Sequence, residues 1–129
     1  MAGFGKIGRS LYKVFMNNTN FWSSLEEVVK NSTIKIDRPK GTAHPRYPDF
    51  IYPVDYGYLE GTSSMDGGGI DIWKGSGNNG LDAIVCIVDS LKKDSEIKIL
   101  LNCTEEEKEQ ILQAQNRGKM SAILINRKS

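Results

Sequence analysis

The chain has 129 residues, of which 39% are hydrophobic and 26% charged, a composition typical of one folded domain and not of a disordered segment. Its formal net charge of +1 provides no broad basic surface, so we do not expect a nucleic-acid partner. No apolar run reaches the length of a membrane-spanning helix, and the two cysteines stand in unrelated contexts. We therefore expect no membrane partner and a reducing, cytoplasmic location.

The N-terminal residues differ from the rest of the chain. We assign residues 1–20 to an N-terminal extension and residues 21–129 to the folded domain. Apolar side chains recur at helical spacing before residue 16, together with basic residues and no acid. Targeting peptides and membrane-surface helices share this pattern. A helix packed on the domain or on a neighbouring subunit explains it as well, and we favour that interpretation.

The next elements alternate between helix, strand and constrained loop. Residues 21–30 place apolar side chains on one helical face. Residues 33–37 alternate, which predicts a strand that presents Lys35 and Asp37 on one side. All four prolines fall within residues 38–58, which excludes regular helix there and interrupts any central strand. Only short strand pieces, at 50–52 and 56–59, are expected in this stretch.

The second half of the chain reads as strands around one further helix. Thr104 and Glu107 have the spacing of a capping box, and Gly118 is expected to end that helix. The remaining strands are expected at residues 70–73, 81–88, 97–101 and 121–125, with a hairpin tip at 92–96. Short strands with one or two helices indicate an α+β fold, which we expect to be a small closed OB-like β-barrel with one or two flanking helices.

Charged side chains are concentrated between residues 35 and 71. Asp66 and Asp71 flank the glycine turn at residues 67–69, which can bring both carboxylates to one side of a strand end. A hard cation such as Mg²⁺ would find oxygen ligands there, and basic side chains opposite would bind a phosphate. A turn aspartate and a solvent-facing strand aspartate explain the pair equally well.

Three segments carry a family resemblance. Residues 52–58 (YPVDYGY) and 64–72 (SMDGGGIDI) resemble the YPxxYGY and SxDGDPxDV segments of soluble family I inorganic pyrophosphatases. Residues 36–45 (IDRPKGTAHP) are similar to the DRPxG[ST]xHP stretch of the short bacterial members of that family. The resemblance implies hydrolysis of inorganic pyrophosphate, or of a related phosphoanhydride, by metal-activated water. It also implies Mg²⁺ as cofactor and a homo-oligomer.

The resemblance assigns roles to individual positions. Lys35 matches the family's phosphate-binding lysine, and either Arg38 or Arg46 matches its phosphate-binding arginine. Tyr56 matches the tyrosine near the metals. The acids that match metal-site positions in these segments are Asp37, Asp66 and Asp71.

A later group of charged residues has two interpretations. Asp94, Glu96 and Lys98 resemble the family's hairpin cluster, in which two acids serve the metal site and the lysine serves the substrate. An ordinary solvated hairpin tip explains the same pattern equally well.

One departure from the family concerns the chemistry directly. Gly68 stands where the family has the middle aspartate, the base for the attacking water. A positioned general base contributes about 10²–10⁴ in rate, whereas a metal site alone can still activate water. Asp49 and Asp55 are the nearest acids that could substitute.

Two other functions compete with hydrolysis. Gly68 favours a catalytically impaired pyrophosphatase-like protein that binds phosphate or nucleotide ligands. The weaker alternative is an OB-like nucleic-acid binder, which would need stacking aromatics beside a basic groove. Buried aromatics of a small barrel explain the available tyrosines and Trp73 more simply.

Overall fold

The computed structural model describes residues 19–127, and contacts divide the chain after Asn31. In the first unit, α2 (Thr19–Lys30) begins slightly before the predicted position. Glu26 and Lys30 form an ion pair one turn apart along it, with 3.6 Å between Oε2 and Nζ. The expected N-terminal extension lies almost wholly outside the described residues.

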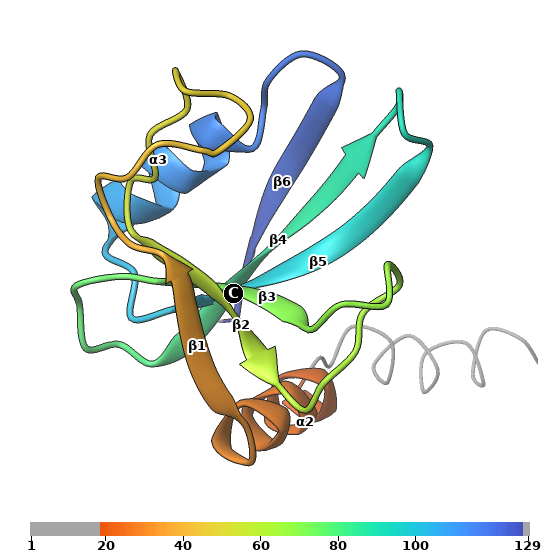
Figure 1. The fold of residues 1–129 in the computed structure, drawn as a ribbon. Helices are drawn as coiled ribbons and strands as arrows, with labels where there is room; N and C mark the ends of the chain where they lie inside the picture. The colour runs from red at the N-terminus through yellow and green to blue at the C-terminus, as the bar shows by residue number, and fades with distance from the viewer. Residues whose placement is uncertain (1–18, 128–129) are drawn as a thin grey trace, which may run out of the picture. The chain divides into compact units, whose positions relative to one another are not determined.

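The second unit is built on a six-stranded mixed sheet with the order β1-β2-β3-β5-β4-β6 (Figure 1). The strands are β1 (Thr33–Arg38), β2 (Asp55–Glu60), β3 (Ile70–Lys74), β4 (Leu81–Asp89), β5 (Asp94–Leu101) and β6 (Met120–Asn126). All neighbours are antiparallel except β3 and β5. The α+β class is thus confirmed. Among the described residues β1 and β6 remain at opposite edges, so the closed barrel is not confirmed.

The proline-rich segment between β1 and β2 contains less strand than predicted. Residues 50–52 form only an isolated bridge between Ile51 and Ala43, because Pro48 and Pro53 remove backbone donors on both sides of that piece. The segment nevertheless covers one face of the sheet. Tyr52 and Val54 are buried there in the same cluster as Trp73 of β3.

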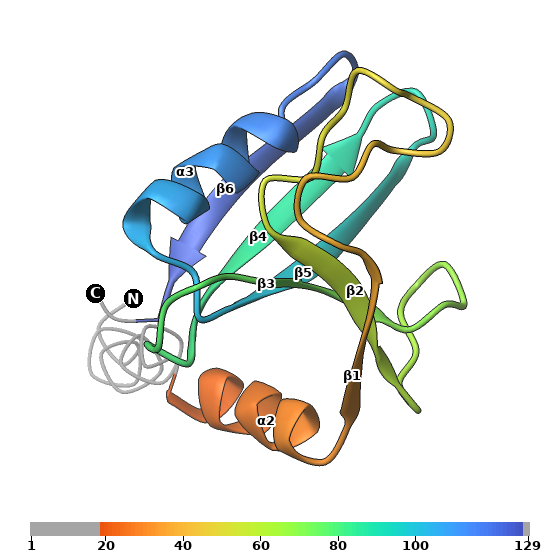
Figure 2. The same ribbon diagram turned by 60° about the vertical axis from the view of Figure 1, so that its left-hand side comes forward.

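The second helix, α3 (Glu105–Ala114), covers the same face and packs against β6 (Figure 2). The predicted capping box is confirmed: Thr104 Oγ1 accepts a bond from the Glu107 N–H, and Glu107 Oε1 accepts one from the Thr104 N–H. The helix ends earlier than predicted, with Gln115 as its C-cap. Gly118, with φ +58°, instead serves the turn into β6. Neither helix in the described part of the chain is long and apolar enough to cross a membrane.

Gly57 sets the spacing between β1 and β2. It pairs with Ile36, and a Cβ at this position would overlap the backbone carbonyl of Lys35. Glycine is therefore needed for the two strands to approach each other at this point. The YGY motif thus has a packing role as well as a chemical one, because the tyrosines on either side face the opposite way from Gly57.

Candidate functional site

The strand register places most of the candidate side chains on one face of the sheet. Tyr58 lies directly between Lys35 of β1 and Asp71 of β3. The next row begins at Tyr56, which pairs with Arg38. Side chains that oppose each other in neighbouring strands point to the same face, and this face also carries the buried cluster that includes Trp73 and Leu100. The candidate residues therefore lie where the core ends.

Four of the predicted residues form a connected group, which we call the Tyr56 cluster: Tyr56 of β2, Asp71 of β3, and Glu96 and Lys98 of β5. The Tyr56 hydroxyl donates to Asp71 Oδ2 at 2.8 Å and accepts from Lys98 Nζ at 2.6 Å. Lys98 Nζ also lies 3.6 Å from Asp71 Oδ2 and 3.4 Å from Glu96 Oε1. Residues far apart in sequence are thus joined in one network.

The Tyr56 cluster is largely removed from solvent, which sets its protonation states. The side chain of Lys98 is only 11% exposed, and a buried charge is tolerated when it is paired. Burial and the Asp71 carboxylate raise the pKa of Tyr56 far above its ordinary value, so the hydroxyl keeps its proton as a donor. Burial also raises the pKa of Glu96; Lys98 opposes this shift, and the Asp71 charge adds to it.

Asp66 lies beside the Tyr56 cluster, in the loop before β3. Its Oδ1 accepts a bond from Ser64 Oγ at 2.6 Å and one from the Gly68 N–H at 2.9 Å. These bonds lower the pKa of Asp66, as does the positive charge of Lys98 to a smaller extent. The carboxylate is therefore held in one orientation, and no described residue bonds to its Oδ2.

The position of the missing aspartate is sterically open. A Cβ built on Gly68 would meet only Asp66 Oδ1, at 3.4 Å, and its φ is not in the left-handed region. Neither proposed substitute reaches the Tyr56 cluster. Asp55 accepts a bond from the Lys40 N–H at 2.8 Å and alternates with Tyr56 along β2, so it faces the other way. Asp49 lies in the exposed part of the proline-rich segment.

The expected phosphate-binding residues are less closely gathered. Lys35 is exposed and forms an ion pair with Glu60 at 3.9 Å. Arg38 lies in the Tyr56 row and interacts with Tyr52, whose pKa is raised by burial and lowered in part by this arginine. Arg46 lies in the loop, where its backbone N–H donates to His44 Nδ1. The register thus distinguishes the two candidate arginines, because only Arg38 is held by the sheet.

Two of the expected metal-site acids lie outside the Tyr56 cluster. Asp37 is the extra residue where the β1–β2 register shifts between Ile36 and Arg38. Asp94 pairs with Asp89 at the far end of the β4–β5 hairpin. No ion pair or hydrogen bond within the described residues joins either acid to the group.

Sequence reasoning missed two contributors. Ser64 orients Asp66; it begins the SMDGGGIDI segment, two residues before that aspartate, where serine commonly forms a local bond. Tyr52 lies between His44 and Tyr56: its ring stacks on His44 with centroids 6.2 Å apart and is tilted against Tyr56 with centroids 5.3 Å apart. Its motif position was recognised, but sequence alone does not show that it links the loop to Tyr56.

The carboxylates have the right chemistry for Mg²⁺, but their present arrangement is incomplete. Asp66, Asp71 and Glu96 supply the oxygen donors that such a cation prefers. Within residues 19–127, however, no group of three or more His, Cys, Asp or Glu side chains is arranged to hold a metal ion. The Lys98 ammonium instead neutralises Asp71 and Glu96.

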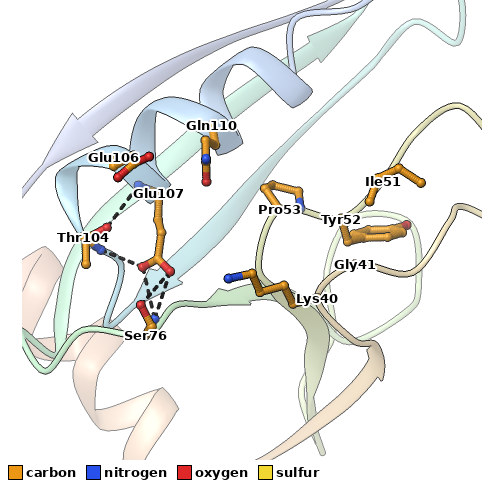
Figure 3. Close-up of a pocket in the computed structure, with 10 residues that line it drawn as sticks. All are labelled: Lys40, Gly41, Ile51, Tyr52, Pro53, Ser76, Thr104, Glu106, Glu107 and Gln110. Atoms are coloured by element: carbon orange, nitrogen blue, oxygen red, sulfur yellow. Dashed lines mark hydrogen bonds between the residues drawn. The ribbon is translucent and has the colours of Figure 1, made fainter.

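A separate cleft of about 530 Å³ lies between the proline-rich segment, the β3–β4 loop and α3 (Figure 3). Its polar side is occupied by structural bonds, because Glu107 accepts from the Ser76 N–H and hydroxyl as well as from Thr104. Although burial opposes the shift, these bonds lower the pKa of Glu107. No member of the Tyr56 cluster lines this cleft, so we do not assign the chemistry to it.

Comparison of the chain with protein-family models, curated proteins and solved structures found no match. The resemblance to pyrophosphatases therefore rests on the three segments described above.

Proposed function

We propose that the chain is a phosphoanhydride hydrolase of the pyrophosphatase type, which splits pyrophosphate or a close analogue with Mg²⁺. The observation that supports this best is the convergence of Tyr56, Asp71, Glu96 and Lys98 from three strands. A solvated hairpin tip, the competing interpretation of Glu96 and Lys98, does not require a buried ammonium bonded to a tyrosine on another strand.

The acidic and the basic residues of the proposed site would have different roles. Asp66 and Asp71, with Glu96, would hold Mg²⁺, which when bound lowers the pKa of water and neutralises phosphate oxygens. Tyr56 orients Asp71 through its hydroxyl. Lys98 supplies positive charge at the buried side, and Arg38 and Lys35 supply it from β1.

A second candidate function is binding without turnover. Gly68 provides no carboxylate to act as the base, and the Asp55 carboxylate already accepts a bond from the Lys40 N–H. A binder would retain pyrophosphate with Mg²⁺ and leave it intact for hours, which calorimetry followed by phosphate analysis would detect. The closed OB-like barrel, the homo-oligomer and the cytoplasmic location expected from the sequence remain predictions.

The test is phosphate release from pyrophosphate with Mg²⁺ by the native chain and by Asp71→Asn. We expect the substitution to lower the rate by at least about 100-fold, because it removes a charged metal ligand while keeping an acceptor for Tyr56. Asp89→Asn makes the same chemical change on β4, where the side chain caps the turn at Leu91, and should leave the rate unchanged. Equal rates for native and Asp71→Asn proteins would refute the proposal.

A further inference from the structure

The outer edge of β6 is chemically unlike most natural sheet edges. The strand, Met120–Asn126 with the sequence MSAILIN, contains no charged residue, proline or glycine. It lies at the end of the sheet beside β4. Edge strands are normally protected by charges, prolines or bulges, because their unpaired backbone groups attract another strand. β6 carries none of these devices.

The hydrogen-bond ladder shows which backbone groups point outward. The Arg127 N–H donates to the Asp82 carbonyl at 2.6 Å, while Asn126 pairs with Ala83. In an antiparallel ladder this makes Asn126 a non-hydrogen-bonded partner, and the same holds for every second residue before it. The N–H and C=O groups of the even-numbered residues of β6 therefore point away from β4.

The chain itself occupies only the first half of this edge. Met120 exchanges both backbone bonds with Arg117. Ala122 is matched by the side chain of Asn116, which accepts from its N–H at 3.0 Å and donates to its carbonyl at 3.2 Å. No described residue bonds to the outward groups of Leu124 or Asn126. Among residues 19–127 the edge is thus capped at its start and bare at its end.

The bare half is complementary to itself. When two β6 strands meet antiparallel about an axis at Ile125, Leu124 of one copy lies opposite Asn126 of the other. Each bare N–H then faces a bare C=O. No two like charges oppose each other, since Arg127 faces Ile123 of the second copy. Ile123 and Ile125, which are 62% and 37% exposed on the outer face, would form one apolar row across the junction.

We propose that a second copy of this chain pairs with β6 about Ile125 and extends the sheet across the two molecules. This inference is independent of the proposed activity, because no residue of the Tyr56 cluster lies on β6. The absence of charge on the strand favours a copy of itself, whereas an unlike partner would need no such restriction.

The first test is the mass of the native chain in solution, by sedimentation over a range of concentrations. We expect a concentration-dependent dimer. Ile125→Lys places two ammonium groups opposite each other and removes two apolar contacts, so the dissociation constant should rise by at least about tenfold. Ile97→Lys is the matched control: the side chain is 45% exposed on β5, away from the edge, and the dimer should persist. A native monomer at all concentrations, or a dimer indifferent to Ile125→Lys, would overturn the proposal.

The second test does not depend on any variant folding. Hydrogen exchange of the native chain should slow at the Leu124 and Asn126 amides as the dimer forms, while the Ala122 amide is protected at every concentration by Asn116. Fast exchange at Leu124 in a dimer would show that another surface associates. Slow exchange at Leu124 in a monomer would show that the chain covers its own edge. Either result contradicts the proposal.

Discussion

The two ends of the sheet are built on different principles. At the β1 end, Lys35, Asp37 and Arg38 supply charge and the register shifts, so the edge is protected and the same charges border the candidate site. At the β6 end the strand carries no charge, and the inner face packs into the core through Leu124. The polar end thus carries charges that border the proposed site, and the apolar end contributes side chains to the core. A substitution at one end should therefore leave the other end intact.

The largest effect is expected at the polar end, from Gly68→Asp. The space beside Asp66 is open, so the acid can be added without moving the backbone. If the base is what the site lacks, the rate of hydrolysis should rise by a factor of about 10²–10⁴. This corresponds to lowering the activation free energy by about 3–5 kcal/mol. Steady-state phosphate release measures this. Gly68→Asn, which adds the same volume without a base, should produce no comparable rise.

The apolar end should respond in stability and not in chemistry. Ile111 of α3 is fully buried, so Ile111→Ala should lower the free energy of unfolding by about 2–5 kcal/mol. Denaturant titration measures the loss, and the activity per folded molecule should be unchanged. Val88→Ala, at a side chain 55% exposed on β4, should stay within about 0.5 kcal/mol. A similar loss for both variants would contradict the position of the core.

Gly57→Ala tests whether the polar end is held by backbone contact. The added Cβ would overlap the Lys35 carbonyl, so β1 must move away from β2. We expect a loss of about 1–3 kcal/mol in the free energy of unfolding, as for other overpacked sites. Ala83→Gly removes a Cβ from a buried position of β4, so it tests the apolar end by deleting a contact instead of adding one. Hydrogen exchange should then be faster at β1 amides only in Gly57→Ala.

The smallest effect concerns pH and the loop beside the polar end. His44 Nδ1 accepts bonds from the Arg46 and Tyr47 N–H groups, which requires a neutral acceptor. Burial, with the charges of Arg38 and Arg46, lowers the pKa of His44 below 6.5. The unfolded chain binds the proton more readily, so this stability is complete above pH 6.5 and is lost as pH falls through the folded value.

The titration of His44 is simple to measure because the chain has one histidine. An NMR titration of the imidazole should give a midpoint below that of an unfolded peptide. Denaturant titration between pH 5 and 7 should show the stability loss in the native chain but not in His44→Gln. A midpoint above 6.5 would contradict the predicted loss of stability at low pH.

The motifs predicted the individual residues better than their partners. Asp71 and Lys98 were both recognised, but no local pattern shows that they lie on adjacent strands, because the parallel β3–β5 pairing joins distant segments. The alternation of residues 94, 96 and 98 indicates that they share one face. Only the register shows that Asp94 lies too far along the hairpin to reach the Tyr56 cluster. The choice between Arg38 and Arg46 likewise required the β1 register. The capping box of Thr104 and Glu107 is local, and that prediction was confirmed. The strand expected at residues 50–52 and the helix end expected at Gly118 were wrong.

The parallel junction between β3 and β5 also has a consequence for folding. β4 and β5 are neighbours in sequence and can pair as a hairpin within microseconds. β3 can then add to β5 through the short connection at residues 75–80, since Lys74 and Leu81 both pair with Leu101. Asp71 meets Lys98 only at that step. During synthesis, a nascent chain that has just passed residue 72 contains the three segments that carry the resemblance but neither Glu96 nor Lys98. The Tyr56 cluster therefore cannot assemble until β5 has been synthesised.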